Sequence, residues 1–339
     1  MKRQLLVYDV TLRDGSHAIQ HQLTKDMIVS YAKLAESAGI PMIEVGHGNG
    51  LGASSLLVGQ SLLTDYEMLE AARENLVNTK LGIHVMPGYA TIKRDIRKAF
   101  EIGVDVIRCG AHCTEADTTE RHISYAREKG KQVFGILMMS HMASKEVLVE
   151  EAFKMESYGA EAILIMDSAG AFLPQDVTDR IGALVGELNI PVGFHAHNNL
   201  GMAIANSVAA VEAGASIVDC SARGFGAGAG NAQIEVLVAV LEKMGYTTGI
   251  DLYSLLDASD LAENIFKHPP VIKPINIVSG LAGVFSGFAK HVERIAIEYN
   301  VDPRDIFLKL GKLKVIAGQE DVIIEVASEL QRGNQKNEK

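Results

Sequence analysis

The feature that most constrains the fold of this chain is an internal repeat, in which a helical stretch ends in glycine and a short β-branched run follows. Four copies stand out, and their glycines are Gly39, Gly103, Gly159 and Gly214. Successive glycines are 64, 56 and 55 residues apart, which is twice the ~30 residues of one strand–helix unit. Each gap therefore has room for one further strand.

Further apolar runs fill these gaps and precede the first copy, at Leu5–Val10, Leu81–Met86, Gln132–Met138 and Val192–His195. Eight short strands alternating with helices predict a parallel (β/α)8 TIM barrel, with an open doubly wound sheet as the alternative. In each of the four copies, the glycine is expected to take the left-handed conformation that ends the helix and turns the chain into the next strand. The helix predicted over Thr24–Ala38 has Thr24 as its N-cap.

Beyond residue 245 the rhythm changes to helix after helix, with a break at His268-Pro269-Pro270. Asp302 and Pro303 suit an N-cap and a first helical position. We therefore expect a barrel over residues 1–245, a small all-helical C-terminal domain over 246–330 and a polar tail over 331–339.

Composition excludes several classes of function. The net charge of −10 is spread along the chain, and the absence of a basic stripe argues against nucleic acid as a partner. No stretch approaches the ~18 apolar residues of a membrane span. The first ten residues read as a strand rather than a signal peptide, and three cysteines make no disulfide framework. We expect a cytoplasmic protein.

Barrel enzymes build their active sites where strands end, so polar residues at those positions are the candidates for chemistry. They follow five of the predicted strands: Arg13, Asp14 and His17; Glu44 and His47; Arg108; Asp167 and Ser168; and His195 and His197.

The strongest signal among these is the pair His195 and His197. Residues two apart in a strand point to the same face, which here is the barrel mouth. Two imidazoles beside a carboxylate form a divalent metal site, and Asp14 is the best-placed carboxylate. The alternative is one hydrogen-bonded core histidine and one surface histidine.

Arg13 and His17 flank this predicted site. Arg13 would place a fixed cation where an enolate or carboxylate oxygen binds, unless it only forms an ion pair with Glu44. His17 lies in a Gly-Ser loop and suits general base catalysis near neutral pH. His21 competes for that role, and either histidine is otherwise a solvated loop residue.

Two further patterns have structural explanations. Phe225–Asn231 is glycine-rich but matches neither a Walker motif nor a dinucleotide fingerprint, so we expect a loop passing close to the metal site, with Asn231 capping the next helix. Cys109 and Cys113 lack the second pair of a zinc knuckle and are expected to be buried thiols.

The chain also resembles a known family. The motifs Asp9-Val-Thr-Leu-Arg-Asp-Gly-Ser-His17, Phe194-His-Ala-His-Asn-Asn199 and Gly228-Ala-Gly-Asn231 are similar to those of the HMG-CoA lyase-like carbon–carbon lyases and synthases. Within them, Ala111–Asp117, Leu137–Met142, Met155–Gly159 and Gly318–Asp321 resemble the 4-hydroxy-2-oxovalerate aldolases, which are class II pyruvate aldolases. The likeness covers nearly the whole chain.

The resemblance implies a function and roles for individual residues. A 4-hydroxy-2-oxo acid is cleaved to pyruvate and an aldehyde by retro-aldol chemistry, as in aromatic hydrocarbon catabolism. It implies a metal, usually manganese with Mg²⁺, Co²⁺ or Zn²⁺ as alternatives, on Asp14, His195 and His197, with Asp14 and His195 also binding substrate. Arg13 would stabilise the pyruvate enolate, and His17 would accept the C4-hydroxyl proton. Ser168 would contact the pyruvyl carboxylate.

One position departs from the family pattern. The family has a tyrosine whose hydroxyl reaches the substrate where this chain has Phe285, which leaves the aldehyde and the stereochemical preference open. The family also implies an oligomer and an acylating acetaldehyde dehydrogenase partner. The rival functions are an acyl-CoA lyase or synthase of the same superfamily, a barrel that binds metabolites without catalysis, and a metal-dependent hydrolase. Hydrolase barrels take their H-x-H pair from strand 1, not strand 7.

Overall fold

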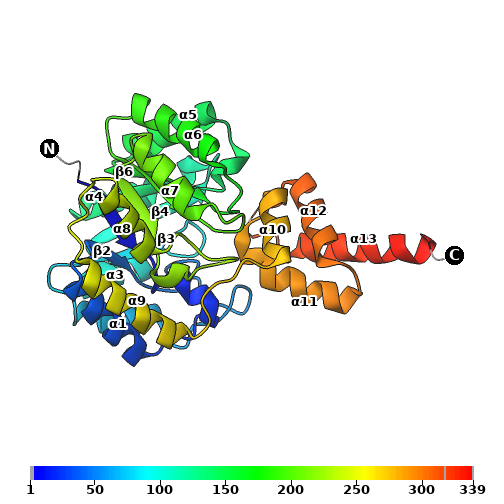
Figure 1. The fold of residues 1–339 in the computed structure, drawn as a ribbon, viewed down its shortest axis with the longest axis horizontal. Helices are drawn as coiled ribbons and strands as arrows, with labels where there is room; N and C mark the ends of the chain where they lie inside the picture. The colour runs from blue at the N-terminus through cyan, green and yellow to red at the C-terminus, as the bar shows by residue number, and fades with distance from the viewer. Residues whose placement is uncertain (1–3, 317, 338–339) are drawn as a thin grey trace.

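The computed structural model describes residues 4–316 and 318–337, without the side chains of residues 334–337. Its centre is a closed barrel of eight parallel strands in sequence order, as predicted (Figure 1). The strands are β1 (Leu6–Asp9), β2 (Met42–Glu44), β3 (Lys80–Val85), β4 (Val106–His112), β5 (Gln132–Met138), β6 (Ala162–Asp167), β7 (Val192–Ala196) and β8 (Ile217–Cys220).

Helices surround the barrel and continue beyond it. Those around the barrel are α1 (Lys25–Ser37), α2 (Asp65–Arg73), α3 (Arg97–Ile102), α4 (Glu120–Glu128), α5 (Lys145–Ser157), α6 (Pro174–Glu187), α7 (Ala203–Glu212), α8 (Ile234–Lys243) and α9 (Leu252–Phe266). The last four are α10 (Pro274–Ala282), α11 (Ala289–Tyr299), α12 (Pro303–Leu313) and α13 (Asp321–Asn337). No helix of the described residues is long and apolar enough to cross a membrane.

Local sequence signals explain where these elements begin and end. The four repeat glycines all have positive φ, between 70° and 115°, as the turn into a strand requires. Thr24 caps α1 by accepting a hydrogen bond from the backbone of Met27. Asp302 caps α12 in the same way, and Pro303 is its first residue. These local predictions are confirmed.

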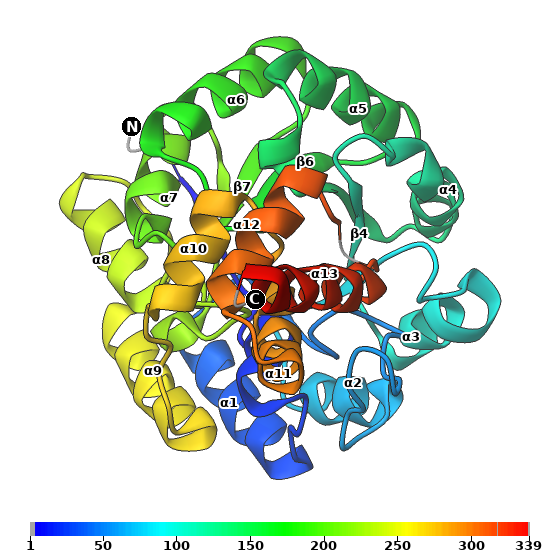
Figure 2. The ribbon, with the colours of Figure 1, turned by 90° about the vertical axis from the view of Figure 1, so that its right-hand side faces the viewer.

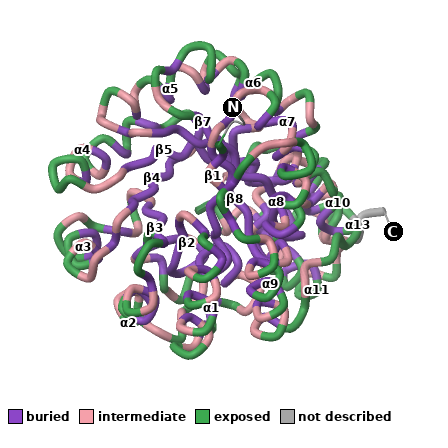
Figure 3. The backbone as a smooth tube through the Cα atoms, turned by 60° about the vertical axis from the view of Figure 1, so that its left-hand side comes forward, coloured by how far each residue is buried: buried purple, intermediate pink, exposed green. Residues whose placement is uncertain are grey.

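Three apolar clusters hold the molecule together. One fills the barrel and includes Tyr8, Phe134 and Leu164, and a larger one lies between the strands and the outer helices. Buried backbone concentrates at the barrel centre (Figure 3). The third cluster, which includes Phe288 and Phe307, belongs to the C-terminal helices. Those helices thus have a core of their own.

The packing differs from the expected domain limits at two places. We expected the C-terminal domain to start at residue 246, but α9 packs against α1 and contributes Leu255 and Phe266 to the barrel's core. We expected a polar tail from residue 331, but α13 continues to Asn337, and residues 338–339 lie outside the described part. Helices α10 to α13 lie over one end of the barrel (Figure 2).

Candidate active site

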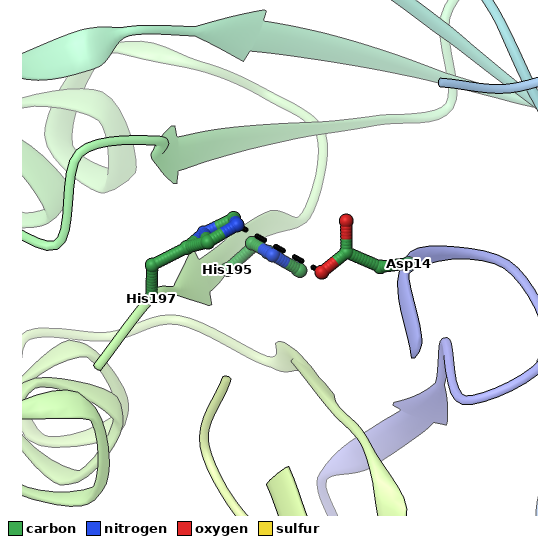
Figure 4. Close-up of side chains that lie close together, drawn as sticks. All are labelled: Asp14, His195 and His197. Atoms are coloured by element: carbon green, nitrogen blue, oxygen red, sulfur yellow. Dashed lines mark ion pairs between the residues drawn. The ribbon is translucent and has the colours of Figure 1, made fainter. Parts of the chain in front are cut away.

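The three predicted metal ligands meet at the carboxyl ends of two strands. Asp14 starts the short 3-10 helix Asp14–Ile19 after β1, His195 lies in β7, and His197 follows directly after that strand. One ligand atom from each side chain lies within 4.8 Å of the other two, and all three residues are buried. Figure 4 shows the two rings and the carboxylate converging.

The protein atoms at this cluster fit a divalent cation. His195 Nδ1 lies 3.2 Å from Asp219 Oδ2, whereas its Nε2 is buried without a hydrogen-bond partner among the residues that the structure describes. A proton on Nδ1 donated to Asp219 leaves the Nε2 lone pair available to a metal. His197 Nε2 lies 3.8 Å from Asp14 Oδ2. Two imidazoles and a carboxylate are a donor set that suits a transition metal.

The protonation states also favour metal binding. Burial alone would raise the pKa of Asp14, but Arg13 and the nearby histidines outweigh it and hold this pKa well below its usual range. Burial, helped by His195, lowers the pKa of His197 to about 3. Asp14 is therefore an anion and His197 neutral near pH 7, the forms in which they ligate a cation.

Arg13 is fixed by three acceptors and keeps one donor free. Its Nε donates to Glu44 Oε2 at 2.6 Å, and its Nη1 donates to Asp14 Oδ1 at 2.9 Å and to the carbonyl oxygen of Gly48 at 3.0 Å. The ion pair with Glu44 considered as an alternative is thus present. Nη2, however, is buried without a partner in the described part of the chain and remains available to a ligand oxygen.

A second buried arginine links this anchor to the metal ligands. Arg108 lies inside the barrel with no exposed surface and bonds Glu44 Oε1 at 3.3 Å. It also donates to Asp219, which in turn holds His195. Positive and negative side chains alternate along this series of contacts, so each buried charge is compensated. The contacts also fix the orientations of Arg13 and His195.

The two histidines that compete for the role of base have different surroundings. His17 lines the same cavity as Asp14 and His197. His21 instead stacks on His47, with ring centroids 3.7 Å apart, and its Nδ1 accepts a hydrogen bond from the backbone of Gly48. Of these two histidines, only His17 lines the cavity beside the predicted metal ligands.

The glycine-rich loop reaches the site, but Asn231 does not act as predicted. Helix α8 begins at Ile234 after Gln233, so Asn231 is no helix cap and that prediction is wrong. Its Nδ2 donates to Asp14 Oδ2 at 2.8 Å. A Cβ on Gly226 would lie 2.6 Å from the Asn231 side chain, so a larger residue there would displace the amide that bonds Asp14.

Comparisons with known proteins agree with this geometry. The HMGL-like family model matches residues 4–262, and the DmpG-like communication domain matches residues 270–332. A relative from Pectobacterium atrosepticum named 4-hydroxy-2-oxovalerate aldolase is 59% identical over 99% of this chain and 98% of its own. One of the same name from Spirochaeta aurantia is 61% identical over 97% of each chain. This chain belongs to the 4-hydroxy-2-oxovalerate aldolase family.

A solved structure extends the likeness to the fold. The carboxyl transferase domain of Rhizobium etli pyruvate carboxylase superposes with a TM-score of 0.81 at 16% identity, over 97% of this chain and 60% of that one. At that identity the likeness concerns the fold alone.

In this member of the aldolase family, a cavity of about 180 Å³ adjoins the predicted metal ligands. Its lining residues include Arg13, Asp14, His17, His197 and Phe285. The position that departs from the family pattern therefore faces the cavity. Ser168 is fully buried, and its Oγ accepts a hydrogen bond from the backbone of Met139 at 2.9 Å. Ser168 is not among the described residues that line this cavity.

Sequence reasoning missed Asn231 as a partner of Asp14, Asp219 as a partner of His195, and His84 as a cavity residue. Asp219 and His84 carry a detectable signal, because a polar residue inside an otherwise apolar strand needs a buried partner. Asn231 carries none, since its contact with Asp14 depends on loops far apart in the chain.

Proposed function

We propose that this chain cleaves 4-hydroxy-2-oxo acids such as 4-hydroxy-2-oxovalerate to pyruvate and an aldehyde, and that it also runs the reverse aldol addition. The main support is the convergence of Asp14, His195 and His197 beside a cavity that also holds Arg13 and His17. The names of the relatives support the same substrate.

Asp14, His195 and His197 would hold the divalent cation, and Asp14 and His195 would also border the bound substrate. When bound, the cation draws electron density from the C2 ketone and stabilises negative charge on its oxygen. Manganese is our proposed ion, since the family resemblance implies it. Magnesium, cobalt and zinc are alternatives, because mixed nitrogen and oxygen donors accept all four ions.

The other residues act on substrate directly. The free Nη2 of Arg13 would bind the oxygen on which charge develops, in a buried site where such a contact is strong. His17 would accept the proton of the C4 hydroxyl as the C3–C4 bond breaks. We also propose that Ser168 donates its hydroxyl proton to the pyruvyl carboxylate, since the bond from Met139 occupies only a lone pair.

The C-terminal helices suggest a partner. Their match to the DmpG-like communication domain supports our proposal that the chain assembles with an acylating acetaldehyde dehydrogenase and forms an oligomer. The three cysteines of this chain are free and buried, which agrees with the cytoplasmic location that we propose, since the cytoplasm is reducing.

A pyruvate-release assay tests the activity. Cleavage of 4-hydroxy-2-oxovalerate should stop after EDTA treatment and return on addition of Mn²⁺. The His195→Ala variant should retain no metal, as measured by elemental analysis, whereas His122→Ala, outside the site, should retain it. Cleavage that survives complete metal removal, or unchanged metal content in His195→Ala, would contradict the proposal.

A further inference from the structure

A buried histidine on β3 faces the cavity without a partner for its ring. His84 is 2% exposed, and its Nδ1 has no hydrogen-bond partner among the described residues. The ring lines the cavity together with Arg13, Asp14 and His17, although none of the roles described above uses it. Leaving a buried polar group unpaired is costly, so a ligand atom is the natural partner.

The imidazole of His84 occupies space that a neighbouring glycine leaves open. A Cβ on Gly110 would lie 2.7 Å from His84 Cε1, and a Cβ on Gly50 would lie 3.1 Å from His84 Cδ2. The distance at Gly110 is too short for a real side chain, so glycine there admits the imidazole, whereas a Cβ on Gly50 would first meet the backbone carbonyl oxygen of His84, at 2.6 Å. The place of the ring beside the cavity is thus fixed by neighbouring backbone.

Three methionines line the cavity together with His84, and Asn49 and Tyr89 line it as well. Met86 follows β3, while β5 and β6 contribute Met138 and Met166. A thioether is only a weak acceptor. Between His84 and these methionines, the imidazole is the stronger hydrogen-bonding partner for a polar atom of a ligand.

The barrel order shows which part of the substrate reaches this wall. His195 and His197 come from the β7 end, and β3 lies four strands from β7 in a ring of eight, on the opposite side of the mouth, whereas Asp14 follows β1, two strands from β3. A substrate held by its 2-oxo acid end at Asp14, His195 and His197 extends across the cavity. The carbons beyond C4, which leave as the aldehyde, then approach His84.

We propose that His84 hydrogen-bonds a hydroxyl group on the carbon next to C4, so that the preferred substrates release a hydroxyaldehyde rather than an alkyl aldehyde. This inference rests on the proposed aldolase function. A neutral imidazole offers one donor and one acceptor, and a hydroxyl group can use either.

Glycolaldehyde and propionaldehyde test the proposal, because they differ only by a hydroxyl in place of a methyl group. The readout is the ratio of their kcat/KM values for addition of pyruvate by the Mn²⁺-loaded full chain. We expect wild type to favour glycolaldehyde about tenfold or more. His84→Leu should remove or reverse this preference, His84→Gln should keep part of it, and Met86→Leu, on the same wall, should keep it.

Each outcome decides one question. A wild-type preference for propionaldehyde, or the same ratio in His84→Leu as in wild type, would overturn the role of His84 while leaving the aldolase function intact. Should His84→Leu fail to fold, the wild-type ratio and His84→Gln still decide. Addition of pyruvate to neither aldehyde would instead overturn the proposed function, and this inference with it.

Discussion

Lys290 donates a hydrogen bond from Nζ to the carbonyl oxygen of His17, at 3.0 Å. Lys290 lies in α11, one of the helices over the barrel mouth, whereas His17 lies in the loop after β1. A side chain of the C-terminal domain thereby holds the loop that carries the proposed base. The domain contributes to the geometry of the site in addition to covering it.

Replacing Lys290 with methionine should lower kcat for aldol cleavage about three- to tenfold, the effect of losing one hydrogen bond that positions a base. Metal content should not change, because the metal ligands lie on the barrel. Steady-state cleavage rates and elemental analysis measure the two effects. Lys312→Met, on α12 and exposed, is the matched control. An unchanged kcat would show that His17 is held by the barrel alone.

Replacing Asp219 with asparagine should weaken metal binding about 10- to 100-fold, as expected when the group that orients a ligating histidine is altered. The amide keeps the volume but loses the charge that pairs with Arg108 and holds His195 Nδ1. Titration of the metal-free protein with Mn²⁺ measures the affinity. Asp260→Asn, which disrupts only an exposed pair with Arg223, should leave affinity unchanged. Equal affinity in both variants would remove Asp219 from this role.

Much of the fold was predictable from local signals. In the four repeat copies, the glycine after the helix and the β-branched run that follows it are read from adjacent residues, and all eight strands were found. The cluster of His195, His197 and Asp14 followed from the period of two in a strand and from the shared edge of a parallel barrel.

The errors concern contacts between distant segments. The amphipathic pattern of α9 shows that one face is buried, but it does not say that α1 covers that face. Asn231 has the local character of a helix cap, yet its side-chain amide donates a hydrogen bond to Asp14, which lies 217 residues away in the sequence. Such pairings depend on how the barrel closes, which no sequence window contains.

The pH dependence of cleavage should report His17. Burial lowers the pKa of His17 below its usual value near 6.5, with Asp14 opposing and Arg13 reinforcing the shift. A base must be neutral, so cleavage should fall only as pH drops through this lowered value, and activity at pH 6.5 should stay near its plateau. The pH profile of kcat/KM measures it. His17→Ala should lower the plateau and lose this acidic limb, and an unchanged limb would assign the titration to another group.

Phe285 lines the cavity, and its ring packs edge-on against Phe288 with centroids 5.6 Å apart. Phe285→Tyr adds a hydroxyl at the far end of a ring that already borders the site. We expect the preference for one C4 configuration to rise about three- to tenfold, because one hydrogen bond would form with only one orientation of the C4 hydroxyl.

Cleavage rates of the two separate enantiomers of 4-hydroxy-2-oxovalerate measure this preference. Phe285→Leu is the control, since it also changes the shape of the cavity wall but adds no donor. If both variants alter the ratio equally, shape and not hydrogen bonding governs the selection. If neither variant alters it, the C4 substituent does not reach Phe285, and selection between enantiomers depends on His17 and the β3 wall, where His84 lies.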